Sequence, residues 1–192
     1  MIGKLVKLGF RFCPARYDWV TKGTHGKTMP NRRAVITTGA AAVLVGCGPG
    51  IASYAGPEVT RIVVQKSQRR LYLLGAYSVL KTYDIDLGFA PVGHKEIEGD
   101  GKTPEGSYYI DRRNPRSAYH LSIGISYPNA QDVAKAKALG KSPGGDIFIH
   151  GARNALARSG KDWTWGCISV SNSEVEEIYA MVRLGTQIDL NA

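Results

Sequence analysis

Short β-branched and aromatic stretches separated by turn residues recur along this chain, and this pattern constrains its fold most. Alternation of apolar and polar residues over about four to eight positions is typical of half-buried β-strands. Only two segments have the spacing of a helix instead. The predicted strands are residues 61–65, 70–74, 79–87, 106–110, 120–125, 146–150 and 186–190.

Two short helices complete the prediction. One covers residues 132–139, and the other follows Ser171 and Glu174, whose spacing is that of a capping box. Gly185 is expected to end the second helix. Its predicted buried face consists of Val175, Ile178, Tyr179 and Val182. Many strands with one or two helices indicate a mainly β fold (a β-rich α+β fold) and exclude a doubly wound α/β sheet.

The net charge of +9 is concentrated at the N-terminus. Residues 1–46 contain eight Lys or Arg and one acidic residue, whereas residues 47–192 contain 17 basic and 15 acidic residues. A nucleic-acid-binding domain carries its basic excess on the folded part of the chain. The distribution therefore argues against nucleic acid as a partner.

The basic segment leads into a pattern typical of an export signal. Arg32 and Arg33, which resemble a twin-Arg motif, precede an uncharged apolar or small run over 34–45 that is too short to span a membrane as a helix. Leu44 to Cys47 resembles a bacterial lipobox, in which the cysteine is lipidated. A short buried helix with a structural Cys47 is the alternative.

These features suggest four segments. Met29 is the expected start, so residues 1–28 are interpreted as a non-native N-terminal extension; a long signal n-region is the alternative. Residues 29–47 form the export signal with its lipobox, and residues 48–58 form a Pro/Gly-rich linker. Residues 59–192 form the main folded domain. The expected location is the periplasm or cell envelope, as a membrane-anchored lipoprotein.

No metal site or organic cofactor is predicted. The four histidines are scattered at positions 25, 94, 120 and 150, and the chain has no HExxH motif. His94 is expected to lie in an exposed loop. The three cysteines are too far apart to form a disulfide framework.

One cysteine and one histidine have the residue types of a nucleophile and its base. His150 ends a predicted strand, and Cys167 follows it in Thr164-Trp165-Gly166-Cys167-Ile168. A neighbouring histidine can take a thiol's proton and return it to a leaving amine. Gly166 leaves room for a carbonyl to approach. Spacing alone does not exclude a structural cysteine and a backbone-paired histidine.

The surrounding residues make the assignment more specific. The order His150-Gly151, a gap of about fifteen residues, and then Thr164-x-Gly166-Cys167 with an aliphatic residue resembles the L,D-transpeptidase catalytic domain (YkuD) family. Asp162-Trp163-Thr164 before Gly-Cys-Ile resembles a proteobacterial branch of it. The resemblance covers roughly residues 59–190, including the Thr103-Pro104-x-Gly106 turn. It implies a β-sandwich or barrel with one or two short helices.

The resemblance also implies roles for individual residues. Cys167 and His150 would be catalytic, with Gly166 and Thr164 shaping the nucleophile turn and its oxyanion site. The residues expected to contact the substrate are Gly151, Arg153, Trp165 and Ser169. Ser169 stands where many members have an arginine that helps hold the substrate, and Arg153 could replace it. Trp163 is equally compatible with the rim of the site and with the core, whereas Asp162 is expected to cap a loop.

The implied function is a cysteine acyltransferase acting on peptidoglycan stem peptides through a Cys167 thioester, as an L,D-transpeptidase. A hydrolase of the same family (an L,D-carboxypeptidase or amidase) and a non-catalytic peptidoglycan-binding module remain open. The protein is expected to be a monomer, attached to the membrane through its lipid. The thiol pKa of Cys167 is expected to be lowered by His150.

Overall fold

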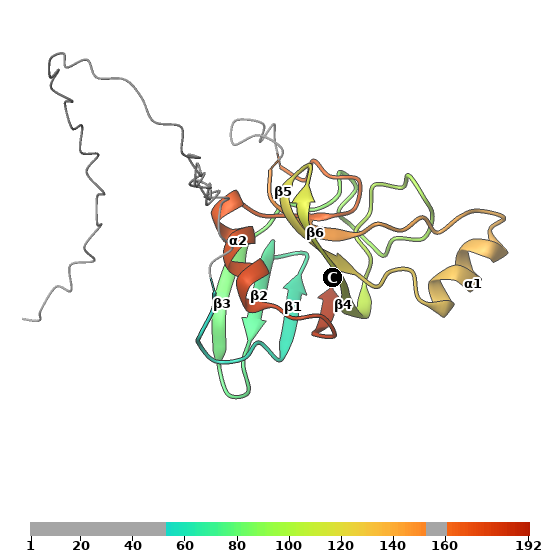
Figure 1. The fold of residues 1–192 in the computed structure, drawn as a ribbon. Helices are drawn as coiled ribbons and strands as arrows, with labels where there is room; N and C mark the ends of the chain where they lie inside the picture. Colours follow the sequence, from blue (N-terminus) through green and yellow to red (C-terminus); the bar gives the residue numbers. More distant parts are fainter. Residues whose placement is uncertain (1–52, 153–160) are drawn as a thin grey trace, which may run out of the picture. The chain divides into compact units, whose positions relative to one another are not determined.

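The computed structural model describes residues 53–152 and 161–192, which form eight strands and two helices (Figure 1). The strands form one mixed sheet in the order β3-β2-β1-β8-β4-β5-β6-β7. They are β1 (Arg61–Gln65), β2 (Arg70–Leu74), β3 (Val79–Asp84), β4 (Gly106–Ser117), β5 (His120–Ile125), β6 (Phe148–His150), β7 (Ile168–Ser169) and β8 (Gln187–Asn191). The helices are α1 (Ala130–Ala138) and α2 (Asn172–Met181). The predicted mainly β fold with short helices is confirmed.

Strand β4 connects the two halves of the sheet. Its first residues pair with β8, and its later residues pair with β5. The register with β5 shifts between Ile110 and Arg112, an irregularity of the kind that bends a strand. β4 is also longer than predicted, because pairing with β5 continues as far as Ser117.

The sheet is not closed, so the expected barrel is corrected. Among the described residues, the segment after β3 pairs with β7 only through the isolated bridge of Asp86 with Ser169, and a second isolated bridge joins Gly88 to Thr164 in the loop before β7. The predicted strand 79–87 therefore ends early. Its chain leaves β2 after Asp84 and turns toward the segment that carries the cysteine.

Strand β8 lies in the middle of the sheet, parallel to β1 and antiparallel to β4. Its register with β1 opposes Ile62 to Ile188 and Val64 to Leu190, and all four side chains are buried. Burial of an aliphatic side chain of this size contributes about 1.5–3 kcal/mol. The C-terminal residues are therefore part of the main core.

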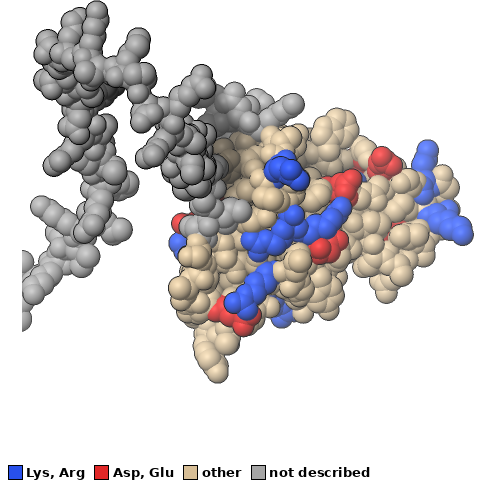
Figure 2. Space-filling model, viewed as in Figure 1, with Lys and Arg blue, Asp and Glu red and all other residues tan. Residues whose placement is uncertain are grey.

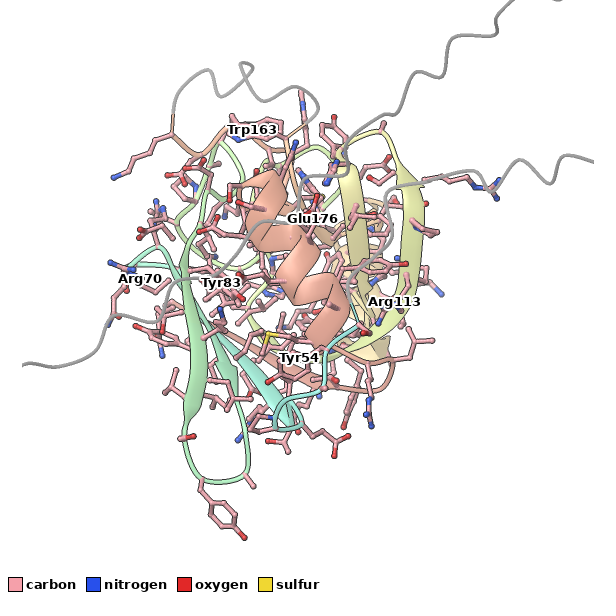
Figure 3. The ribbon with its side chains drawn as sticks, turned by 60° about the vertical axis from the view of Figure 1, so that its left-hand side comes forward. Tyr54, Arg70, Tyr83, Arg113, Trp163 and Glu176 are labelled. Atoms are coloured by element: carbon pink, nitrogen blue, oxygen red, sulfur yellow. The ribbon has the colours of Figure 1, made fainter. Side chains whose placement is uncertain are left out.

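Helix α2 packs against β5 and β6 and carries the predicted capping box of Ser171 and Glu174. Figure 3 shows Tyr83 and Arg113 on opposite sides of this helix. Arg113 donates to the carbonyls of Tyr179 and Val182 at the helix end. The helix ends at Met181, earlier than the predicted stop at Gly185, because Val182 already has an extended conformation.

Helix α1 projects from one end of the sheet (Figure 1). Only Asp132 and Ala136 of this helix are buried. On the face drawn in Figure 2, acidic side chains lie beside basic ones, and basic side chains gather at the end formed by α1. Within residues 53–152 and 161–192, no helix combines the length and the apolar character needed to cross a membrane.

Candidate active site

The pairing of β6 with β7 brings His150 and Cys167 to one face of the sheet. Residues opposed in a parallel pair point to the same side, and successive residues alternate. Ile149 and Ile168 are opposed and fully buried in the core. His150 and Cys167 therefore share the other face, where both line a cavity of about 450 Å³.

The backbone of Gly151 determines which nitrogen of His150 carries hydrogen. His150 Nδ1 lies 2.6 Å from the Gly151 carbonyl oxygen. A carbonyl oxygen only accepts hydrogen bonds, so Nδ1–H must be the donor and Nε2 remains the basic nitrogen. His150 is buried, and burial lowers its pKa from the usual 6.5. The ring is therefore uncharged at neutral pH.

Two aromatic rings hold the imidazole in place. The Tyr119 ring centroid lies 4.6 Å from that of His150, and the Trp163 centroid lies 5.7 Å away at nearly right angles. Trp163 lies beyond the N-terminal end of α2 (Figure 3). The Tyr119 carbonyl also accepts a hydrogen bond from the Gly151 N–H at 3.1 Å. His150 and Gly151 are thus fixed through both ring and backbone.

The turn before Cys167 depends on two residues of the predicted motif. Gly166 has φ +121°, and a Cβ there would lie 2.5 Å from the Lys102 carbonyl oxygen. The buried Thr164 hydroxyl donates to the Cys167 carbonyl at 2.6 Å and accepts from the Gly166 N–H at 3.2 Å. The Gly166 N–H is thus engaged within the turn by the Thr164 hydroxyl.

A buried lysine anchors the loop that supports this turn. Lys66 Nζ donates to the Gly93 carbonyl at 2.6 Å, to the Thr103 carbonyl at 2.9 Å and to the Glu105 carboxylate at 2.8 Å. Burial lowers the pKa of Lys66, and Glu105 opposes that shift. Lys66 thereby fixes the segment whose Lys102 carbonyl contacts Gly166.

The environment of the Cys167 thiol differs from the expectation. Its Sγ is half-buried and donates to the Asp146 carbonyl at 3.5 Å. Burial is the largest influence and raises the thiol pKa; the negative charge of Asp146 acts in the same direction, while a backbone hydrogen bond from Phe148 opposes it. The expected lowering is therefore wrong, because the buried His150 ring carries no charge to stabilise a thiolate.

A family model for the L,D-transpeptidase catalytic domain matches residues 59–190. This chain belongs to that family. The match covers both helices and all of the sheet except Asn191, together with the cavity that Cys167 and His150 line. The predicted resemblance is thereby confirmed at the level of the family.

Two relatives show how much of a larger protein the chain resembles. Over 108 residues it is 32% identical to YafK of Escherichia coli (strain K12), a provisional L,D-transpeptidase by name, covering 55% of this chain and 38% of YafK. The crystal structure of Pgp2, the helical cell shape determining protein of Campylobacter jejuni, matches with a TM-score of 0.55 and 28% identity. That match covers 71% of this chain and 49% of Pgp2. The chain spans less than half the length of either relative.

Of the substrate-binding residues expected for an L,D-transpeptidase, Trp165 lines the cavity. It is 72% exposed and packs edge-on against the Phe89 ring at 4.9 Å, forming an aromatic rim. Gly151 and Ser169 are buried and do not line the cavity. Arg153 lies outside the described residues.

Gly151 and Ser169 instead occupy packing positions. A Cβ on Gly151 would lie 2.4 Å from Asn172 Oδ1 at the start of α2. Ser169 is fully buried directly opposite His150 in the β6–β7 register. The small size of both residues lets α2 and β7 approach β6.

Asp162 has a structural role in the loop before Cys167. Asp162 accepts three hydrogen bonds from Arg69, at 2.7, 2.9 and 3.1 Å, and one from the Leu87 N–H at 3.0 Å. These contacts lower the pKa of Asp162 against the effect of burial, and they connect the loop before Cys167 to the turn between β1 and β2. The predicted capping role is consistent with this geometry.

His94 is not in an exposed loop as expected. Its Nδ1 accepts from the Glu105 N–H at 3.0 Å, and its Nε2 lies 3.2 Å from the buried Asp132 carboxylate. It lines a cavity different from that of Cys167. Within the described part of the chain, no group of three or more His, Cys, Asp or Glu stands together as a metal site.

Sequence reasoning did not find Tyr119 or Lys66. Tyr119 lies in the β4–β5 turn, and only the β5–β6 pairing brings it to His150. Lys66 follows β1 directly, and its contacts lie 27 to 39 residues away. Neither position carries a local signal, because both roles depend on contacts between distant segments.

Proposed function

We propose that this chain is a cell-envelope cysteine acyltransferase acting on peptidoglycan stem peptides through a thioester on Cys167. The main support for this proposal is the fixed tautomer of His150. Its Nδ1–H is hydrogen-bonded to the Gly151 carbonyl, and its ring lines the same cavity as Cys167. That arrangement leaves Nε2 as a base for the thiol. Family membership supports the same chemistry.

In the first half-reaction, the Cys167 sulfur attacks the carbonyl carbon of the amide bond that follows the diaminopimelate residue. The thiol proton passes to His150 Nε2, and the carbonyl oxygen becomes an oxyanion. The Cys167 N–H is the proposed donor to that oxygen, since the Gly166 N–H is engaged by Thr164. Collapse breaks the C–N bond, the imidazolium protonates the leaving amine, and a thioester remains.

In the second half-reaction, an acceptor amine attacks the thioester carbon. Its proton passes through His150 to the departing sulfur, which restores the thiol. A raised Cys167 pKa and a lowered His150 pKa favour a neutral resting pair. Proton transfer therefore accompanies attack, and no preformed thiolate is required.

The cavity walls suit a peptide. Aromatic rings of Tyr119, Trp163 and Trp165 supply apolar surface, and Asn114, Ser117 and Ser122 supply polar groups for amide recognition. This mixture supports a stem peptide as the acyl donor.

A hydrolase of the same family is the second candidate. The observation in its favour is Ser169, which stands where the family resemblance places a substrate-holding arginine and is fully buried. Without that arginine, water could replace an amine as the acceptor, and the product would be a shortened peptide.

The test is incubation of the purified full chain with a tetrapeptide muropeptide, followed by mass spectrometry. A cross-linked dimer supports transpeptidation, a tripeptide product supports the hydrolase, and no product indicates a binding module. Cys167→Ser should abolish turnover, because a hydroxyl is a poorer nucleophile of similar size. Cys13→Ser, which changes a cysteine with no assigned role, should not. Equal loss in both variants would contradict the assignment.

We also propose that the protein is exported and anchored to the membrane through lipid on Cys47, which lies outside the described residues. Metabolic labelling with a palmitate analogue should mark the wild type and not Cys47→Ala. Equal labelling of both would exclude the anchor. Stable attachment needs more than one acyl chain, because a single chain binds a membrane marginally.

The start at Met29 and the division into residues 1–28, 29–47, 48–58 and 59–192 form part of the same proposal. A tag placed at Met1 should be missing from the precursor made in cells, if translation begins at Met29. Detection of that tag on the precursor would exclude this start.

A further inference from the structure

A second hollow adjoins the active-site cavity, and Asp146 lines both. The second hollow has a volume of about 570 Å³, and its lining includes Glu98, Asp111, Arg112, Tyr127 and Ser142. The Asp146 carbonyl accepts a hydrogen bond from the Cys167 thiol at 3.5 Å. Asp146 therefore links this hollow to the Cys167 thiol.

Arg112 is held at the boundary between the two hollows by three contacts. Its Nη1 donates to Asp146 Oδ1 at 2.9 Å, and its Nε donates to Asp111 Oδ1 at 3.1 Å. Its guanidinium lies 4.8 Å from the centroid of Phe148, which lines the active-site cavity. Gly124 leaves space for it, because a Cβ there would lie 2.9 Å from Arg112 Nε.

The Arg112–Asp146 ion pair leaves one cationic nitrogen and one anionic oxygen free to bind a ligand. Among residues 53–152 and 161–192, Arg112 Nη2 and Asp146 Oδ2 make no hydrogen bond. The Asp146 side chain is 82% exposed and that of Arg112 is 44% exposed, so a solute can reach both. A cationic and an anionic group so close together match a ligand that has an ammonium and a carboxylate on one carbon.

We propose that Arg112 and Asp146 form the subsite for the amino acid on the amine side of the reacting bond. This inference rests on the proposed acyl transfer. In the donor peptide that amino acid has an acylated nitrogen and a free carboxylate, which Arg112 binds through Nη2. In an incoming acceptor the nitrogen is a free ammonium, which Asp146 binds through Oδ2.

An acceptor bound in this subsite can then react with the thioester on Cys167. The bound ammonium loses one proton to solvent, and the resulting amine attacks the thioester carbon. The C–S bond breaks as the C–N bond forms, and the second proton passes through His150 to the Cys167 sulfur. Arg112 thus supplies the carboxylate recognition that Ser169 does not.

The test measures protection of the Cys167 thiol, so it requires no turnover. The full chain is treated with iodoacetamide in the presence of D-alanine, D-alaninamide or N-acetyl-D-alanine, and alkylation at Cys167 is followed by peptide mass spectrometry. In the wild type, D-alanine should protect at a concentration about tenfold lower than either analogue. Each analogue lacks one charge, and one charge-assisted contact has about this effect.

Each variant should abolish the preference for D-alanine over one analogue and keep the preference over the other. In Arg112→Gln, D-alanine should protect no better than D-alaninamide, while its advantage over N-acetyl-D-alanine remains. In Asp146→Asn, the advantage over N-acetyl-D-alanine should disappear instead. Arg112→Lys, which keeps the charge without the planar fork, should lie between the wild type and Arg112→Gln.

Arg116→Gln is the matched control, since it removes one exposed positive charge from the same strand. It should keep the wild-type order of protection. Absence of protection by D-alanine in the wild type, or unchanged discrimination in Arg112→Gln, would overturn the subsite. Failure of the wild type to convert a tetrapeptide would contradict the proposed function and leave these protection results interpretable.

Discussion

The Cα atoms of His150 and Ser169 are directly paired in the parallel β6–β7 ladder, which places Cys167 diagonally across from the histidine. The relative position of Cys167 and His150, the proposed nucleophile and base, therefore depends on strand register. A shift of one residue would turn one of the two side chains into the core.

The first prediction concerns the Cys167 thiol. Because burial raises its pKa, alkylation at Cys167 should have a midpoint above that of an ordinary cysteine. His150→Ala should not raise this midpoint further, since the neutral imidazole does not stabilise a thiolate. The measurement is the pH dependence of iodoacetamide labelling, resolved by site. A midpoint below the ordinary value that rises in His150→Ala would show a preformed ion pair instead.

The second prediction concerns the acid limb of activity. Burial lowers the pKa of His150 below 6.5, so Nε2 stays unprotonated to more acidic pH than in an ordinary histidine. Turnover should therefore persist below pH 6.5 and fall only as the pH passes the lowered pKa. The rate of tetrapeptide conversion against pH checks this. Loss of activity centred above pH 6.5 would contradict the assigned environment.

The same shift affects stability, and its sign follows from proton uptake. As pH falls through about 6.5, His150 in the unfolded chain binds a proton while the folded ring does not. The unfolded state then binds more protons, so the free energy of unfolding should decrease with acidification in this range. Urea unfolding at several pH values should show a smaller decrease in His150→Gln than in the wild type. Identical slopes in the two proteins would exclude this contribution.

The third prediction concerns Gly166. Alanine there would have to adopt φ +121° with its Cβ 2.5 Å from the Lys102 carbonyl, so Gly166→Ala should destabilise the fold by more than about 2 kcal/mol and abolish turnover. Gly140→Ala is the control. That position has φ +65° with nothing within 4 Å, so only the backbone cost of about 1 kcal/mol applies. Equal destabilisation in urea would contradict the role of the close contact.

The fourth prediction concerns the Thr164 hydroxyl. Thr164→Val keeps the shape and leaves the Cys167 carbonyl and the Gly166 N–H without this partner. Loss of a buried hydrogen-bonding group costs about 1–3 kcal/mol, and the turn should also position Cys167 less well. Thr164→Ser, which retains the hydroxyl, should recover most of the stability and turnover. If both variants behave alike, the hydroxyl does not hold the turn.

Local patterns predicted the elements that depend on local interactions. The capping box of Ser171 and Glu174 and the burial of Val175, Ile178 and Tyr179 were predicted correctly, because both signals lie within one helix. The buried Met181 was not predicted, and Val182 is buried just beyond the helix end. The strand after Val79 was predicted too long. Its continuation at Asp86 is decided by a bridge to Ser169, which is 83 residues away in the sequence.

The candidate site was predictable only in part, for the same reason. His150 and Cys167 carry a sequence pattern, but the sign of the thiol pKa shift depends on burial by segments distant in sequence. Arg112 has no motif and gains its position from Asp111, Asp146 and the Phe148 ring. Such roles follow from the tertiary structure alone.

The central position of β8 also determines when this sheet can assemble. Because residues 187–191 lie between β1 and β4, the earlier strands have no complete sheet to join until a ribosome has released that segment. The domain should therefore fold after synthesis of residue 191, and a nascent chain stopped before Gln187 should remain sensitive to protease. β1 and β4 therefore remain without their shared neighbour β8 until residues 187–191 have been synthesised.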